Sequence, residues 1–153
     1  TLDFDDELLK EVDLVIASIH SSFSQKRELI MERLRNALNN PHVDLIAHPT
    51  GRVIGRRDGY DVDMDELIQL AKETNTALEL NANPNRLDLS VEHLKKAQAA
   101  GVNIIINTDA HNIDMLEDMK IGVSAGKKAQ LQQNTVLNTK SVDELLAFLK
   151  RND

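Results

Sequence analysis

The sequence predicts an α/β fold built from parallel strand–helix units, and two observations support this. Short apolar segments alternate with longer amphipathic segments along the chain, an order typical of parallel strands joined by right-handed helical crossovers. Several apolar segments are continuous apolar runs, such as IIIN at 104–107, as expected for strands buried on both faces. With 153 residues, we expect a single domain over 1–153.

Four strands and one weaker strand are predicted, each a short apolar run bounded by polar residues. They cover 13–18, 43–48, 76–83, 102–107 and, as the weaker fifth strand, 135–139.

Helices are predicted from apolar residues at helical spacing, and they cover 24–40, 63–75, 90–100 and 141 to about 150. Ser24 and Asp63 are the predicted N-caps, Gly101 is the predicted C-terminal stop, and Leu29 is placed on the buried face of its helix. The small-residue segment 121–126 is predicted to be a tight packing turn, with ligand contact as the alternative.

The composition excludes several classes of function. The formal net charge is −7, whereas a broad nucleic-acid-binding surface needs a positive one. The absence of cysteine excludes disulfides, thiolate metal sites and a cysteine nucleophile. No apolar run reaches the roughly 18 to 20 residues that span a bilayer. We therefore expect a cytoplasmic protein with no membrane partner.

Polar residues at the ends of the predicted strands form the candidate site. They are His20, His48, Glu79, Asn81, Asn83, Asp109 and His111. The carboxyl ends of parallel strands lie on one face, where sites form. One histidine after a strand is more often a surface or capping residue, but three of the five histidines share this position. A divalent metal site of imidazole and carboxylate ligands is favoured, and His42 and His93 are given no role.

The connection over 49–62 is long for a compact domain, and long loops are often functional. It carries Arg52, Arg56 and Arg57 among three glycines, which suits phosphate or DNA binding because arginine binds phosphate through two parallel hydrogen bonds. A solvated surface loop is the alternative. Arg86, after the third strand, is a weaker candidate of the same type.

Four segments, VIASIHSSF, LIAHPTGRVIGRRDGYDVD, ALELNANPNRLDLS and INTDAHN, occur in this order. Together they resemble the PHP (polymerase and histidinol phosphatase) domain, and in detail the C-terminal PHP domain of bacterial family X DNA polymerases. The resemblance implies parallel βα units forming part of a distorted (βα)7 TIM-like barrel, with up to three metal ions at the strand ends. Mn or Zn is implied, and Fe is possible.

The resemblance also implies roles for single residues. His20 and His48 match two ligands of one metal, Asp109 a ligand of a second and His111 a ligand of a third. Asp109, His111 and His48 are the implied catalytic residues, with Glu79, Asn81 and Asn83 lining the site. The implied activity is metal-dependent phosphoesterase activity, most closely that of the 3′-5′ exonuclease and end-processing domain of a repair polymerase. The substrate would be DNA or another phosphoester, acted on within a longer parent protein.

The sequence departs from this family at its start, because it contains no His-x-His motif and only five predicted strands where the barrel has seven. We therefore expect the C-terminal portion of a PHP domain, with the N-terminal strands missing, fewer metals and impaired activity. The open barrel edge would favour self-association, which light scattering checks. A non-catalytic scaffolding fragment and a small-molecule phosphatase of the histidinol-phosphatase type are the alternatives.

Overall fold

Four strands form one sheet in the order β1-β2-β3-β4, and each neighbouring pair is parallel. The strands are β1 (Ile16–Ala17), β2 (Leu45–Ile46), β3 (Ala77–Asn81) and β4 (Ile104–Asn107). This is a computed structural model, and it describes residues 2–149. The all-parallel sheet confirms the expected α/β class.

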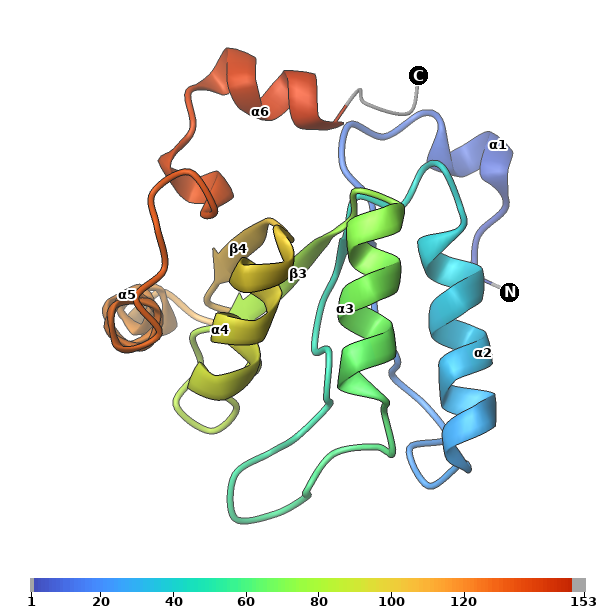
Figure 1. Cartoon of the computed structure of the whole chain (residues 1–153), viewed down its shortest axis with the longest axis horizontal. Helices are drawn as coiled ribbons and strands as arrows, with labels where there is room; N and C mark the ends of the chain where they lie inside the picture. The colour runs from blue at the N-terminus through green and yellow to red at the C-terminus, as the bar shows by residue number, and fades with distance from the viewer. Residues whose placement is uncertain (1, 150–153) are drawn as a thin grey trace.

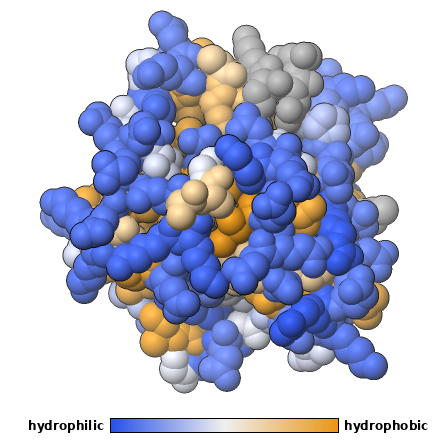
Figure 2. All heavy atoms as spheres, viewed as in Figure 1, coloured by the Kyte–Doolittle hydropathy of each residue, from blue (hydrophilic) through white to orange (hydrophobic). Residues whose placement is uncertain are grey.

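The crossover helices are α2 (Arg27–Leu38), α3 (Met64–Glu73) and α4 (Val91–Ala100). They lie side by side over one face of the sheet (Figure 1), and hydrophilic side chains cover most of their outer surface (Figure 2). A doubly wound sheet carries helices on both faces, whereas a barrel carries its crossover helices on one. The arrangement is therefore consistent with part of a βα barrel.

The remaining helices are α1 (Asp6–Leu9), α5 (Met119–Lys128) and α6 (Val142–Leu149), with 3₁₀ turns η1 (Asp114–Asp118) and η2 (Leu137–Thr139). The expected end of the last helix near Lys150 lies outside the described residues. No helix within 2–149 combines the length and the apolar character needed to cross a bilayer.

The two faces of the sheet are covered unequally. The face under α2–α4 packs into the main core, to which Ile46, Leu78 and Ile104 belong. On the opposite face, a smaller cluster of Leu45, Ala47, Ala77 and Leu137 packs against residues of α6. Ile16 pairs with Leu45 in the sheet yet is 51% exposed. The expected self-association through this edge stays a prediction.

The predicted fifth strand is wrong. Val136 makes one isolated parallel bridge to Ile104, and the chain then turns into η2. Asn138 explains the change, because its side chain accepts from the backbone N of Ile106 at 2.7 Å and donates to the carbonyl of Ile106 at 2.9 Å. A side chain thus takes the place of the next backbone pair.

The predicted caps have different outcomes. Asp63 and Ser90 cap α3 and α4 by accepting from backbone N atoms three residues on, and Gly101 ends α4 at φ 82°. The predictions for Asp63 and Gly101 are confirmed. Ser24 is not a cap, because α2 begins at Arg27, with Lys26 at the N-cap position and no capping side chain. The prediction that Leu29 is buried is also wrong, because it is 46% exposed.

The segment 121–126 is helical, so the predicted tight turn is wrong. It lies inside α5. A Cβ on Gly122 would lie 2.7 Å from both the Ala82 Cβ and the Ile106 Cγ2 atoms. The glycine therefore lets α5 approach β4 and the end of β3 closely, and its role is packing.

Candidate active site

His48 follows β2 in a left-handed backbone conformation, with φ 50°, and is buried. Non-glycine residues adopt such angles uncommonly, and such angles cluster at functional sites. Hydrogen bonds hold both the backbone N and the carbonyl of His48. The His48 amide donates to Glu79 Oε2 at 2.9 Å, and its carbonyl accepts from Tyr60 Oη at 2.5 Å and Gly51 N at 2.9 Å. These bonds fix the backbone from which the His48 imidazole extends.

Glu79 and Asn81 lie on β3 and alternate with Leu78 and Leu80 of the main core. Strand alternation therefore places both polar side chains on the opposite face of the sheet. Asn81 Nδ2 lies 3.3 Å from Glu79 Oε2 and 3.4 Å from His48 Nδ1.

Asn107, at the end of β4, completes this network by donating from Nδ2 to Glu79 Oε1 at 3.1 Å. The second carboxylate oxygen of Glu79 lies 3.4 Å from His48 Nδ1. Burial by itself would raise the pKa of Glu79, but hydrogen bonds from His48 and Asn107 outweigh it and hold this pKa below its ordinary value. Glu79 therefore stays ionised and accepts hydrogen bonds beside His48.

Asp109 follows β4 and, like His48, has a left-handed backbone, with φ 56°. Its Oδ2 lies 3.9 Å from His48 Nε2 and 3.5 Å from Arg86 Nε. The His20 and His48 rings meet edge to face with centroids 5.5 Å apart. The structure thus brings together His20, His48 and Asp109 from three strand ends, with Arg86 beside them.

His111 is oriented differently from the other predicted ligands. Its side chain is exposed, and its Nδ1 lies 2.7 Å from the carbonyl oxygen of Asp109. Asn83 has a local role as well, since its Oδ1 accepts from Asn85 N at 2.9 Å in the turn after β3.

The donor set fits a single divalent ion in part. Ligand atoms lie roughly 2.0 to 2.2 Å from Zn, so the 3.9 Å between His48 Nε2 and Asp109 Oδ2 is within the span of one ion. Within residues 2–149, however, no group of three or more His, Asp or Glu side chains is assembled at metal-binding spacing. His48 and Asp109 are therefore close enough to bind one ion together, and the described residues do not form a complete set of metal ligands around them.

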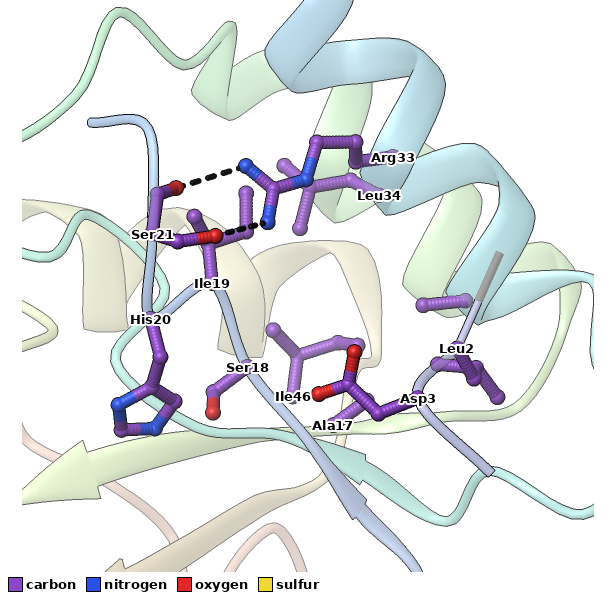
Figure 3. Close-up of a pocket in the computed structure, with 11 residues that line it drawn as sticks. Leu2, Asp3, Ala17, Ser18, Ile19, His20, Ser21, Arg33, Leu34 and Ile46 are labelled. Atoms are coloured by element: carbon purple, nitrogen blue, oxygen red, sulfur yellow. Dashed lines mark hydrogen bonds between the residues drawn. The ribbon is translucent and has the colours of Figure 1, made fainter. Parts of the chain in front are cut away.

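A small pocket adjoins His20 at the β1 edge. Figure 3 shows the His20 ring on one side and the Asp3 carboxylate on the other. Arg33 of α2 anchors the segment after His20 by donating to the carbonyl of Ser21 at 2.8 Å. The pocket volume is about 100 Å³, below the roughly 300 to 1,000 Å³ of typical small-molecule sites. This pocket alone is too small for a nucleotide.

The three arginines of the 49–62 loop differ in how far contacts with the rest of the chain hold their side chains. Arg52 donates to the carbonyls of Arg86, at 2.8 Å, and of Leu87. Arg57 donates to the carbonyl of Gly51 at 2.8 Å, and its guanidinium lies 4.1 Å from the centroid of the Phe23 ring. Arg56 is exposed. These contacts favour a structural contribution from Arg52 and Arg57, and phosphate binding by all three stays a prediction.

Three residues of the site lie beyond the sequence prediction. They are Tyr60, Asp88 and Asn107. Asn107 had a detectable signal, because it is the last residue of the predicted strand 102–107, as Asn83 is of the predicted strand 76–83. Tyr60 and Asp88 had none, because each acts through one hydrogen bond or more to the 48–51 turn, to which neither is adjacent in the sequence.

Comparison with known proteins gives relatives of two kinds. No protein-family profile matches the chain. The chain is 63% identical to the DNA polymerase/3′-5′ exonuclease PolX of Bacillus subtilis over all of its 153 residues, which match 27% of the length of PolX. The chain is similar to one part of PolX. It is also 30% identical over 158 residues to a probable phosphatase of Thermoanaerobacter sp., covering 97% of this chain and 62% of that protein.

A third relative is a probable phosphatase of Clostridium acetobutylicum, 33% identical over 118 residues, which are 72% of this chain and 46% of that protein. The chain thus spans about a quarter of PolX and less than two thirds of each phosphatase. The relatives carry names of hydrolases that act on phosphate esters.

Proposed function

We propose that the chain is part of a PHP-type, metal-dependent phosphoesterase domain, and that it serves the 3′-5′ exonuclease of a family X DNA polymerase in DNA repair. The observation that carries the proposal is the contact of His48 with both Glu79 and Asp109 at the strand ends. The 63% identity to PolX over the whole chain supports the polymerase assignment.

The proposed roles follow from the contacts. His20, His48 and Asp109 would hold divalent metal, Mn or Zn, and His111 would join them on reorientation of its side chain. A bound metal lowers the pKa of water and clamps a phosphoryl group. Glu79 orients His48 through its backbone amide and ring, as the hydrogen-bonding partners of metal-binding histidines do. Arg86, whose Nε lies 3.5 Å from Asp109 Oδ2, would bind phosphate.

A small-molecule phosphatase is the second candidate, and the two phosphatase relatives favour it. The pocket beside His20 is small, which argues for a substrate that lies across an open surface, such as a nucleic-acid end.

A segment exchange tests the proposal. Because the identity is 63% along the whole chain, residues 1–153 can replace the matched segment of Bacillus subtilis PolX. We expect the chimera, with Mn²⁺, to shorten a single-stranded oligonucleotide from its 3′ end and to leave 4-nitrophenyl phosphate largely intact. Preference for the small ester would favour the phosphatase. Hydrolysis of neither, in a folded chimera that still polymerises DNA, would contradict the proposal and favour a scaffolding role.

A further inference from the structure

Asp88 is a fully buried carboxylate, 0% exposed, in the segment that returns from β3 to α4. Its Oδ2 accepts from the backbone N atoms of Thr50 and Gly51, each at 3.0 Å. These two residues directly follow the proline after His48. Asp88 therefore binds the turn that begins at His48, although it lies far along the chain from that turn.

The backbone of Asp88 is fixed at the same time. Its carbonyl accepts from Asn81 N at 2.5 Å, and Leu89 N donates to the carbonyl of Glu79 at 3.3 Å. The segment around Asp88 thus runs beside the end of β3, which carries the two polar residues of the site. One side chain therefore connects the ends of β2 and β3.

The contact with Gly51 acts directly on the conformation of His48. The Gly51 N–H is shared between Asp88 Oδ2, at 3.0 Å, and the carbonyl of His48, at 2.9 Å. The bond from Gly51 N to the His48 carbonyl closes the turn in which His48 adopts φ 50°. Tyr60 supports the same turn, since its hydroxyl donates to the His48 carbonyl. A Cβ on Gly51 would lie 2.4 Å from the Tyr60 ring, so no larger residue fits there.

We propose that Asp88 is a positioning residue whose carboxylate holds the 48–51 turn and thereby directs the His48 ring toward Glu79 and Asp109. The catalytic consequence rests on the proposed phosphoesterase function, whereas the positioning itself does not. The complete burial of Asp88 agrees with this role. Burial raises the pKa of Asp88, although the N–H groups of Thr50 and Gly51 oppose this, so the sequence keeps an acid where ionisation is costly.

Asp44 offers a matched control. It is also a buried aspartate that accepts from a backbone N–H, that of Val15 at 2.7 Å. It precedes β2, whereas His48 follows it. Asp44→Asn therefore perturbs the same strand by similar chemistry at the end away from the proposed site.

NMR spectroscopy of the 153-residue chain, with selectively labelled histidine, tests the positioning. We expect Asp88→Ala to shift the backbone amide and imidazole signals of His48 and to change the residual dipolar coupling of its backbone N–H. Asp88→Asn should have a smaller effect, because it keeps one acceptor oxygen. Asp44→Asn should leave these signals in place. Urea unfolding of each variant gives its stability. His48 signals unchanged in a folded Asp88→Ala variant, or moved equally by Asp44→Asn, would overturn the proposal.

Kinetics in the PolX chimera separate this inference from the proposed function. Loss of a hydrogen-bonding partner that orients a metal ligand typically costs about 10- to 100-fold in activity, so we expect kcat of Asp88→Ala to fall in that range, with KM nearly unchanged and Asp88→Asn less affected. In the His48→Ala background the same change should have little further effect. If the parent chimera hydrolyses nothing, the proposed function fails, and the NMR result still decides whether Asp88 positions His48.

Discussion

His48→Ala is expected to lower the 3′-5′ exonuclease activity of the PolX chimera by at least about 100-fold. Mutating only the hydrogen-bonding partner of a metal ligand already lowers activity by about 10- to 100-fold, and this variant removes the ligand itself. The variant removes the ring that lies within 4 Å of both Glu79 and Asp109. DNA polymerisation should be unaffected, because it is expected to reside outside the exchanged segment. The measurement is the release of nucleotides from a labelled oligonucleotide, alongside primer extension by the same preparation.

His42→Ala is the matched control for this variant. His42 lies in the connection from α2 to β2, before the strand that His48 follows. It should therefore retain the parent exonuclease rate. Exonuclease activity in His48→Ala close to that of His42→Ala would rule out the assignment of His48.

Glu79→Gln is expected to destabilise the chain at pH 7 by about 1 to 3 kcal/mol, the cost of leaving buried donors unsatisfied. Glu79 is 3% exposed, and its two oxygens accept from His48 N and Asn107 Nδ2. A glutamine presents one oxygen and one NH₂ group, so it cannot accept from both. Urea unfolding at pH 7 measures the difference, with exposed Glu32→Gln on α2 as the control.

The pH dependence of this difference has a definite sign. Because the pKa of folded Glu79 is lowered, its contribution is present above the unfolded pKa, about 4.3, and is lost as the pH falls through the folded pKa. The stability gap between wild type and Glu79→Gln should therefore narrow below about pH 4. A gap that is absent at pH 7, or that widens in acid, would contradict the proposed network.

The pH dependence of the stability that Asp88 contributes has the opposite sign. Wild type must therefore be compared with a variant that changes Glu79 alone. Its folded pKa is raised, so the associated stability is present below the unfolded pKa and is lost as the pH rises through the folded pKa. The wild-type profile sums both effects. The difference between wild type and Glu79→Gln isolates Glu79.

The fold could be predicted where local signals agreed with tertiary packing. Asp63 begins α3 and Gly101 ends α4 as expected, because caps depend on the residues next to them. The signals failed where tertiary contacts decided. Gly122 lowers helix propensity, yet α5 forms through close packing on Ala82. Asn138 replaces a strand pairing that its β-branched neighbours favour.

The site was partly predictable for a similar reason. Parallel strands deliver their final residues to one edge of the sheet, so His20, His48 and Asp109 meet as the strand ends required. The direction of each side chain needed more than strand order. His111 bonds to the backbone of its own turn, and the turn that carries His48 bonds to Tyr60, later in the same loop, and to Asp88, beyond β3.

The metal content of the purified chain tests the central claim most directly. After purification without added metal and dialysis, elemental mass spectrometry should find close to one equivalent of Mn, Zn or Fe per chain. The double variant His20→Ala/His48→Ala should lose it, while His42→Ala should keep it. A folded chain that binds no metal, or one whose bound metal survives loss of both histidines, would contradict the proposed metal site.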